Sequence, residues 1–172
     1  PLSLAEVDEV PADASAVLIV GAWDDFTAQE VERLAAYLQR GGRLGIFADP
    51  PVIEAAISGA PGNTFLDADS PLNTYLWDEF GVRALDALII ETMPELVNGS
   101  EWLPILNTIA PHTIMSDVRD EPIYTRFVRP LQVADLPTER QNAYVREPLL
   151  YTSEQSFGET ALSDFIEGRI AY

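Results

Sequence analysis

The chain has 172 residues with a formal net charge of −18, so we expect a single domain whose charge argues against nucleic acids and anionic lipid surfaces as partners. All ten basic residues are arginine and cysteine is absent, which excludes a P-loop lysine, a Schiff base, a thiolate nucleophile and a disulfide. His112 is the only histidine, so a multi-histidine metal site cannot form within this chain. We expect neither a metal nor a cofactor.

Residues 16–51 carry the clearest structural pattern. The apolar run 17–20 predicts a strand covered on both faces. Thr27 and Glu30 form a capping box at the start of a helix whose apolar residues recur at helical spacing. Gly41-Gly42 ends that helix, and a second strand follows at 44–48. A strand, a helix and a strand in so short a segment favour parallel pairing with a right-handed crossover.

The remaining pattern extends this alternation. Apolar spacing and turn residues predict further helices at 52–58, 72–80 and 160–168, and further strands at 82–91, 123–128, 130–133 and 148–152. Residues 93–107 fit no single interpretation. The order of elements favours an open α/β sheet with helices on its faces.

Open α/β sheets bind ligands outside the carboxyl ends of their strands. The candidate ligand-binding residues at those ends are Trp23, Asp24, Asp49, Glu91 and Ser153. Each also has a structural interpretation: Asp49 precedes Pro50 in a turn, and Ser153 is typical of a turn or helix cap.

His112 is a sixth candidate, as a general base or as a hydrogen-bonded loop residue. A hydrolase acting on a carbohydrate or an ester, through acidic residues with His112 or Ser153, is the alternative function. The G-x-S-x-G elbow is absent around Ser153, so the sequence assigns no catalytic residue. A structural interaction module, such as a homodimer, is a third interpretation.

Several segments together resemble a known family. They are Val10-Pro11-Ala12-Asp13, the helix end Tyr37-Leu38 with Arg40-Gly41-Gly42-Arg43-Leu44, Asp49-Pro50, residues 72–82, Leu149-Leu150-Tyr151-Thr152-Ser153 and residues 156–160. In these the chain resembles the soluble domain of auxiliary components of uncharacterised ABC-type transport systems. That group includes the gliding-motility GldG proteins and shares a domain with an intraflagellar-transport protein. The family's His-Pro-hydrophobic-Thr motif is altered here to Pro111-His112-Thr113.

The resemblance implies a three-layer, mostly parallel open sheet, flavodoxin-like or class I glutamine-amidotransferase-like. It also implies a location at the extracytoplasmic face of the cytoplasmic membrane, beside the permease and ATPase subunits of a transporter or another auxiliary subunit. We therefore expect residues 1–172 to be one α/β domain, a soluble piece of a longer membrane-anchored protein. Its expected function is non-enzymatic: it binds a partner protein or a small ligand, such as a carbohydrate or a peptide, at the strand ends.

Overall fold

The computed structural model describes residues 2–50, 64–135 and 137–161. Its first elements are β1 (Val17–Val20), α1 (Ala28–Gln39) and β2 (Leu44–Phe47). The two strands pair in parallel from Val17 opposite Leu44 to Val20 opposite Phe47, as the sequence predicts. The helix between them is the crossover that parallel pairing requires.

The N-terminus of α1 is closed by the predicted capping box. Thr27 Oγ1 accepts a hydrogen bond from Glu30 N at 3.3 Å, and Glu30 Oε2 accepts one from Thr27 N at 2.9 Å. Two of the helix's orphan N–H groups are thereby satisfied, because the first turn has no preceding carbonyls to bond.

The predicted helix at 72–80 is confirmed as α3 (Pro71–Phe80). Ser70 caps its first turn, and Pro71 occupies a position where its missing N–H costs nothing. Gly81 ends the helix in the left-handed conformation, at φ 69°, which a residue with a Cβ adopts less readily.

After α3 the described chain consists of short strands, turns and single-turn 3₁₀ helices. The strands are β3 (Val82–Ala84), β4 (Leu88–Ile90), β5 (Ile105–Leu106), β6 (Thr108–Ile109), β7 (Ile123–Tyr124), β8 (Leu131–Val133), β9 (Leu150–Tyr151) and β10 (Phe157–Glu159). The 3₁₀ helices are η1 (Pro94–Leu96), η2 (Thr113–Met115) and η3 (Gln141–Ala143). The pairs β3–β8, β4–β10, β5–β7 and β6–β9 are all antiparallel.

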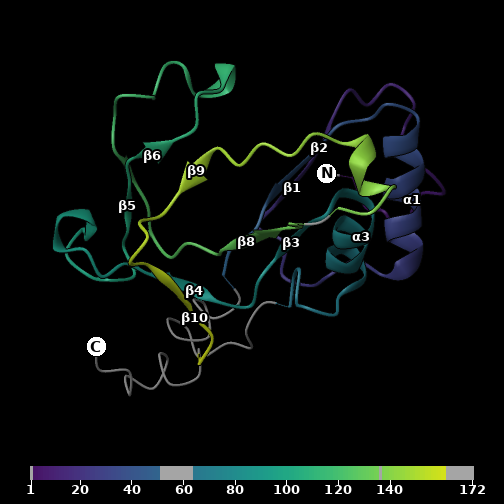
Figure 1. The fold of residues 1–172 in the computed structure, drawn as a ribbon. Helices are drawn as coiled ribbons and strands as arrows, with labels where there is room; N and C mark the ends of the chain where they lie inside the picture. The colour runs from purple at the N-terminus through teal and green to yellow at the C-terminus, as the bar shows by residue number, and fades with distance from the viewer. Residues whose placement is uncertain (1, 51–63, 136, 162–172) are drawn as a thin grey trace.

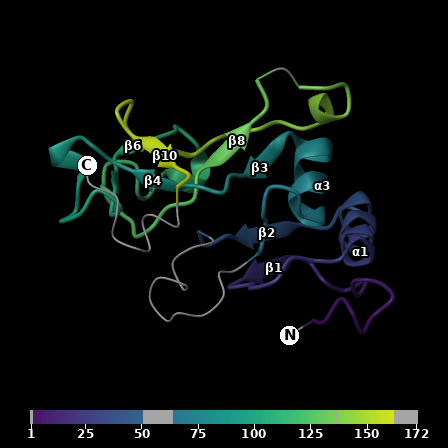
Figure 2. The ribbon, with the colours of Figure 1, turned by 90° about the horizontal axis from the view of Figure 1, so that it is seen from below.

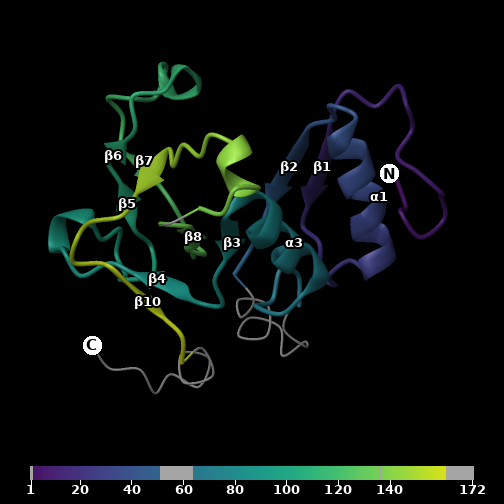
Figure 3. The ribbon, with the colours of Figure 1, turned by 45° about the vertical axis from the view of Figure 1, so that its right-hand side comes forward.

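The expected three-layer, mostly parallel, flavodoxin-like or class I glutamine-amidotransferase-like sheet is therefore wrong. The described strands form five two-stranded sheets, of which only β1–β2 is parallel. Parallel neighbours need a long crossover, usually a helix, and beyond α3 the described segments contain turns and 3₁₀ helices instead. Figure 1 shows α1, α3, β1 and β2 on one side of the molecule and β5, β6 and β9 on the other, and Figure 3 shows the same division.

The predicted strand at 82–91 is divided into β3 and β4. Between them Leu85 N donates to the carbonyl of Pro130, while the Leu85 carbonyl accepts from the Arg129 side chain. Asp86 turns its carboxylate to the same arginine. The backbone is thus shaped around Arg129, a tertiary contact that the local pattern does not contain.

The main hydrophobic core lies between α1, α3 and the inner face of β1–β2, elements that lie together in Figure 2. Its buried members include Ile19 from β1, Leu34 and Tyr37 from α1, Phe65, and Leu72 from α3. The core therefore covers one face of the parallel pair.

Two expectations lie largely or wholly outside the described residues. The helix expected at 52–58 falls within 51–63, and that at 160–168 has only its first two residues described. The strands expected at 123–128, 130–133 and 148–152 are present in shortened form as β7, β8 and β9.

Candidate functional site

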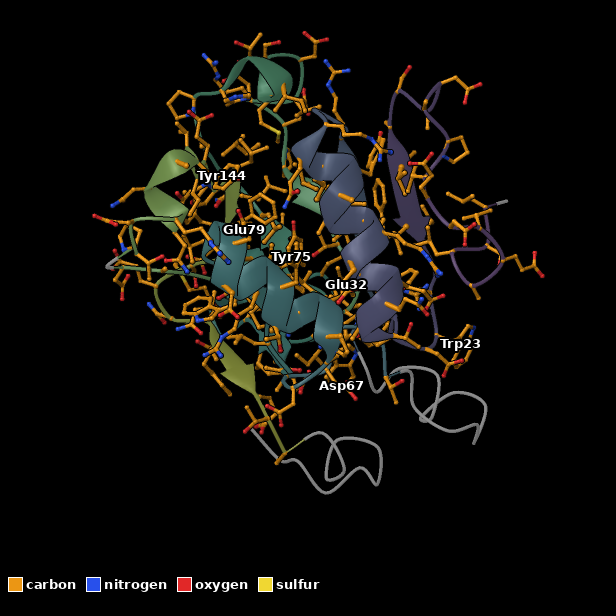
Figure 4. The ribbon with its side chains drawn as sticks, turned by 90° about the vertical axis from the view of Figure 1, so that its right-hand side faces the viewer. Trp23, Glu32, Asp67, Tyr75, Glu79 and Tyr144 are labelled. Carbon is orange, nitrogen blue, oxygen red and sulfur yellow. The ribbon has the colours of Figure 1, made fainter. Side chains whose placement is uncertain are left out.

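The carboxyl ends of β1 and β2 lie at the same edge of the parallel pair, because Val20 faces Phe47 in register. Trp23 follows β1 with its side chain 44% exposed, and Asp24 beside it is also exposed. Asp49 follows β2 and is exposed too. Three of the six candidate residues are thus brought to one end of the sheet. Figure 4 labels Trp23 below the N-terminal end of α1.

The face of β1–β2 that points away from the core carries large apolar side chains. Leu18 is 66% exposed, Val20 68% and Phe47 60%. The three share a face because strand residues alternate and the register places Val20 beside Phe47 and Leu18 beside Gly45. Leu18 Cδ2 lies 2.7 Å from where a Cβ on Gly45 would be, so the glycine lets the leucine lie flat across the pair. We call Leu18, Val20 and Phe47 the bare face.

The sequence predicts the strand at 17–20 but not the exposure of one of its faces. The continuous apolar run 17–20 predicts a strand covered on both faces, and this is wrong for the face that carries Leu18 and Val20. It does not reveal that the described chain covers one side and leaves the other exposed. That property depends on where the other elements pack.

Glu91 and Ser153, two further candidates, lie in direct contact. Ser153 Oγ donates to Glu91 Oε1 at 2.7 Å, although 62 residues separate them. The same oxygen accepts from the N–H groups of Thr92 and Met93, each at 2.9 Å. Glu91 is fully buried, at 0% exposure, and its Oε2 has no hydrogen-bond partner in the described part of the chain.

The turn that carries Ser153 is also bound to Thr92, the residue after Glu91. Thr92 Oγ1 donates to the carbonyl of Gln155 at 2.9 Å, and Gln155 N donates back to Ser153 Oγ at 3.2 Å. This turn joins β9 to β10, and β10 pairs with β4, which ends just before Glu91. Strand pairing and side-chain contacts together fix the residues around the carboxylate.

His112 lies apart from Ser153 in its hydrogen bonding. Its Nδ1 accepts from Ile114 N at 3.1 Å, which leaves Nε2 to contact Glu147 Oε2 at 2.9 Å. In the alternative hydrolase, Ser153 is the candidate nucleophile and His112 the candidate base. Ser153 contacts Glu91, whereas His112 contacts Glu147. His112 is therefore a hydrogen-bonded loop residue that caps the 3₁₀ helix η2. This agrees with the structural role considered for it from the sequence.

Arg129 forms the most extensive polar centre and was not among the candidates. Its guanidinium donates to the carbonyls of Phe65, Leu66 and Leu85 at 2.8 to 2.9 Å and to Asp86 Oδ1 at 2.5 Å. Burial lowers the pKa of Arg129, and the carboxylate of Asp86 opposes that effect. A lone arginine in an apolar-flanked segment gives no sequence signal for such a role.

The same centre holds Leu66 in a left-handed backbone conformation, at φ 59°. Its N–H donates to Asp25 Oδ1 at 3.2 Å, and its carbonyl accepts from Asn73 Nδ2 at 3.0 Å as well as from Arg129. Asp25 also accepts from Leu72 N at the start of α3. These contacts stabilise a conformation that costs roughly 1–2 kcal/mol for a residue other than glycine.

Asp67 adjoins this centre at the N-terminal end of α3, as Figure 4 shows. Burial raises the pKa of the Asp67 carboxyl, and the nearby charges of Asp86 and Asp25 raise it further, while Arg129 opposes them. The ionised form of Asp67 is therefore less favourable in the folded chain than in the unfolded chain.

A small aromatic cluster attaches the segment around η3 to α3. Tyr144 packs edge-on against Phe80, and its hydroxyl donates to Glu79 Oε1 at 3.2 Å. Burial and the charge of Glu79 raise the pKa of Tyr75, which also packs edge-on against Phe80. Figure 4 shows Tyr75, Glu79 and Tyr144 together on this side of the molecule.

The described residues lack two kinds of feature. Residues 2–50, 64–135 and 137–161 contain no group of three or more His, Cys, Asp or Glu side chains placed to hold a metal ion. No helix in the same ranges is both long and apolar enough to cross a membrane.

Among solved structures, the chain is similar to the N-terminal domain of mmIFT52, with a TM-score of 0.52 and 16% identity over 78% of this chain and 56% of that one. At this identity the likeness is one of fold, and this chain spans little more than half the length of that domain. No curated protein matches the chain. The family model described as an ABC-type uncharacterized transport system matches residues 1–167, and the chain belongs to that family.

Proposed function

We propose that this chain is a non-enzymatic accessory domain of its transport system and that it docks on another protein of that system through the bare face. Family membership supports the role in an ABC-type transport system. The observation that carries the docking site is the exposure of Leu18, Val20 and Phe47 side by side on one parallel strand pair.

Parallel strands are usually covered on both faces, because the crossover helices that connect them pack against the sheet. The core covers the inner face of β1–β2, whereas the bare face exposes two aliphatic side chains and one aromatic side chain. Fully burying a side chain of this kind contributes roughly 1.5–3 kcal/mol. Three such side chains are enough to form the centre of an interface, where a few residues carry most of the binding free energy.

The charges beside the bare face define the chemistry of the partner. Asp24 and Asp49 are exposed at the edge where β1 and β2 end, next to Trp23. A complementary surface has an apolar centre and basic residues facing these two carboxylates. A second copy of this chain fits less well, because each copy has a formal net charge of −18.

The partner we propose is a permease or a second auxiliary subunit of the same transporter, reached from the extracytoplasmic side of the membrane by a membrane-anchored form of this protein. Protease treatment of intact spheroplasts tests the location: an extracytoplasmic domain is digested without lysis. Protection until the membrane is broken would contradict it.

Docking is tested by measuring the affinity of the chain for each cognate subunit, held in nanodiscs, by biolayer interferometry. Phe47→Ser and Val20→Ser are each expected to weaken binding at least about tenfold, because a central apolar contact is lost. Both side chains are already mostly exposed, so the fold should survive, which circular dichroism verifies.

Leu131→Ser is the matched control. Leu131 is 63% exposed, much like Phe47, but lies on β8 in a different sheet. Its substitution should leave the affinity unchanged. Equal losses for Leu131→Ser and Phe47→Ser, or no effect of either substitution at the bare face, would refute docking through that face.

A further inference from the structure

The buried carboxylate of Glu91 is unevenly satisfied. Its Oε1 accepts three hydrogen bonds, from Ser153 Oγ at 2.7 Å and from Thr92 N and Met93 N at 2.9 Å each. Its Oε2 is buried and accepts none in the described part of the chain. All three donors thus approach the same oxygen of the carboxylate.

No described side chain balances that charge. The ion pairs in the described ranges join Arg40 to Glu9, His112 to Glu147, Arg129 to Asp86 and Arg140 to Glu79, and none includes Glu91. Burying an ion without a counter-charge costs several kcal/mol. A buried charge is for this reason normally paired or bound to a metal ion.

Residues that contact Glu91, or that contact its neighbours, also carry oxygen atoms. Ser153 and Thr92 contribute hydroxyl groups, and Gln155 and Glu101 contribute carbonyls that accept hydrogen bonds from Thr92 Oγ1 and Glu91 N, respectively. The chain has no cysteine, and its single histidine contacts Glu147 instead. Carboxylate, hydroxyl and carbonyl oxygens are ligands that hard cations such as Ca²⁺, Mg²⁺ or Na⁺ prefer, whereas softer transition metals favour nitrogen and sulfur.

We propose that Glu91 Oε2 binds a hard, monatomic cation whose other ligands come from hydroxyl and carbonyl oxygens at the junction of β4 and the β9–β10 turn. A cation supplies the missing positive charge, which a neutral water molecule does not. The site is independent of the bare face and adds to the proposed docking function rather than resting on it.

The test is thermal unfolding of the chelator-treated chain, with Ca²⁺, Mg²⁺, Na⁺ or K⁺ chloride added at one ionic strength maintained with choline chloride. Binding to the folded state alone raises the melting temperature. We expect one of the small cations to raise it by at least about 4 °C near saturation. Glu91→Gln keeps the shape of the side chain but removes the charge, and should abolish the rise.

Two further variants make the outcome decisive. Glu154→Gln removes an exposed carboxylate from the same turn and should keep the full rise. Ser153→Ala removes one contact of Oε1 but keeps the charge, so it should reduce the rise without abolishing it, and it replaces Glu91→Gln if that variant fails to fold. No rise with any cation, or an equal rise in wild type and Glu91→Gln, would overturn the proposal.

Discussion

Arg129 connects parts of the chain that are distant in sequence. Its partners lie 43 to 80 residues away and include the carbonyl of Asp49 at the end of β2. Its side chain is only 1% exposed, so its N–H groups depend on these protein partners rather than on water. One arginine thus joins the end of the parallel pair to the antiparallel part of the molecule.

Replacing Arg129 by methionine should destabilise the chain by about 3 kcal/mol, because the carbonyls of Phe65 and Leu66 lose their donors and Asp86 loses its counter-charge. Urea unfolding measures the change. Arg140→Met is the control: Arg140 pairs with Glu79 but its side chain is 67% exposed, so the loss should be at most about 1 kcal/mol. Similar losses for the two variants would argue against the special role of Arg129.

Asp67→Asn should be more stable than wild type at neutral pH. The pKa of Asp67 is raised above its usual 3.8 in the folded chain, so the folded state binds the proton more tightly than the unfolded state does. Ionisation therefore costs stability above the raised pKa, and the cost disappears as the pH falls through that pKa towards 3.8. Urea midpoints of both proteins between neutral and acid pH should converge on acidification.

Asp69→Asn, in the same turn, is the control for this comparison because Asp69 is exposed. Its stability difference from wild type should stay small throughout. A gap between Asp67→Asn and wild type that widens at low pH would contradict the electrostatic assignment.

At the level of elements, α1 shows how local chemistry and packing combine. The capping box closes its first turn, and Val31, Leu34 and Tyr37 turn inward to the core. Tyr37 also donates its hydroxyl to the Ala14 carbonyl and accepts from Arg43 N, each at 3.2 Å. Helix, incoming chain and β2 are thereby held in register, which places the bare face on the opposite side of the strands.

Thr27→Ala should lower the stability by about 1 kcal/mol, because Glu30 N loses the side-chain oxygen that caps it. Differential scanning calorimetry or urea unfolding measures the loss. Gln39→Ala, at the exposed end of the same helix, should be close to neutral, since alanine is a good helix former. A neutral Thr27→Ala would mean that packing alone maintains the first turn.

For the molecule as a whole, charge and exposed apolar surface oppose each other. A formal net charge of −18 keeps copies apart, whereas the bare face attracts other apolar surfaces. The repulsion is screened by salt, because the Debye length falls from about 30 Å at 0.01 M to about 3 Å at 1 M.

Sedimentation velocity should therefore show monomers at low ionic strength and association as NaCl approaches about 1 M, where the repulsion is screened. Val20→Ser combined with Phe47→Ser should remove the association, while Leu131→Ser should not. Association that is unchanged in the double variant would place the attractive surface elsewhere.

Local patterns predicted the elements that local chemistry creates. The capping box of Thr27 and Glu30, the parallel pairing of β1 and β2, and the helix at 72–80 are all confirmed. The mostly parallel sheet failed because a strand's partner is set by contacts distant in sequence. The sequence of a two- or three-residue strand such as β8 does not indicate which strand it will pair with, or in which direction.

The candidate site divides in the same way. The rule that ligands bind at strand ends selected Trp23, Asp24 and Asp49, which the parallel register brings to one edge, and also Glu91 and Ser153. Arg129, Asp86 and the bare face were missed, because their roles depend on burial and on neighbours far along the chain.

The sequence by itself determined the acidic charge, the absence of lysine and cysteine chemistry, the β1–α1–β2 unit and the family resemblance, because these depend on residue types and short spacings. Only the tertiary structure decided that Ser153 meets Glu91, that Arg129 joins the two parts of the chain, and that one face of β1–β2 stays exposed. Burial and pairing arise when distant segments pack together, and no short window of sequence contains that information.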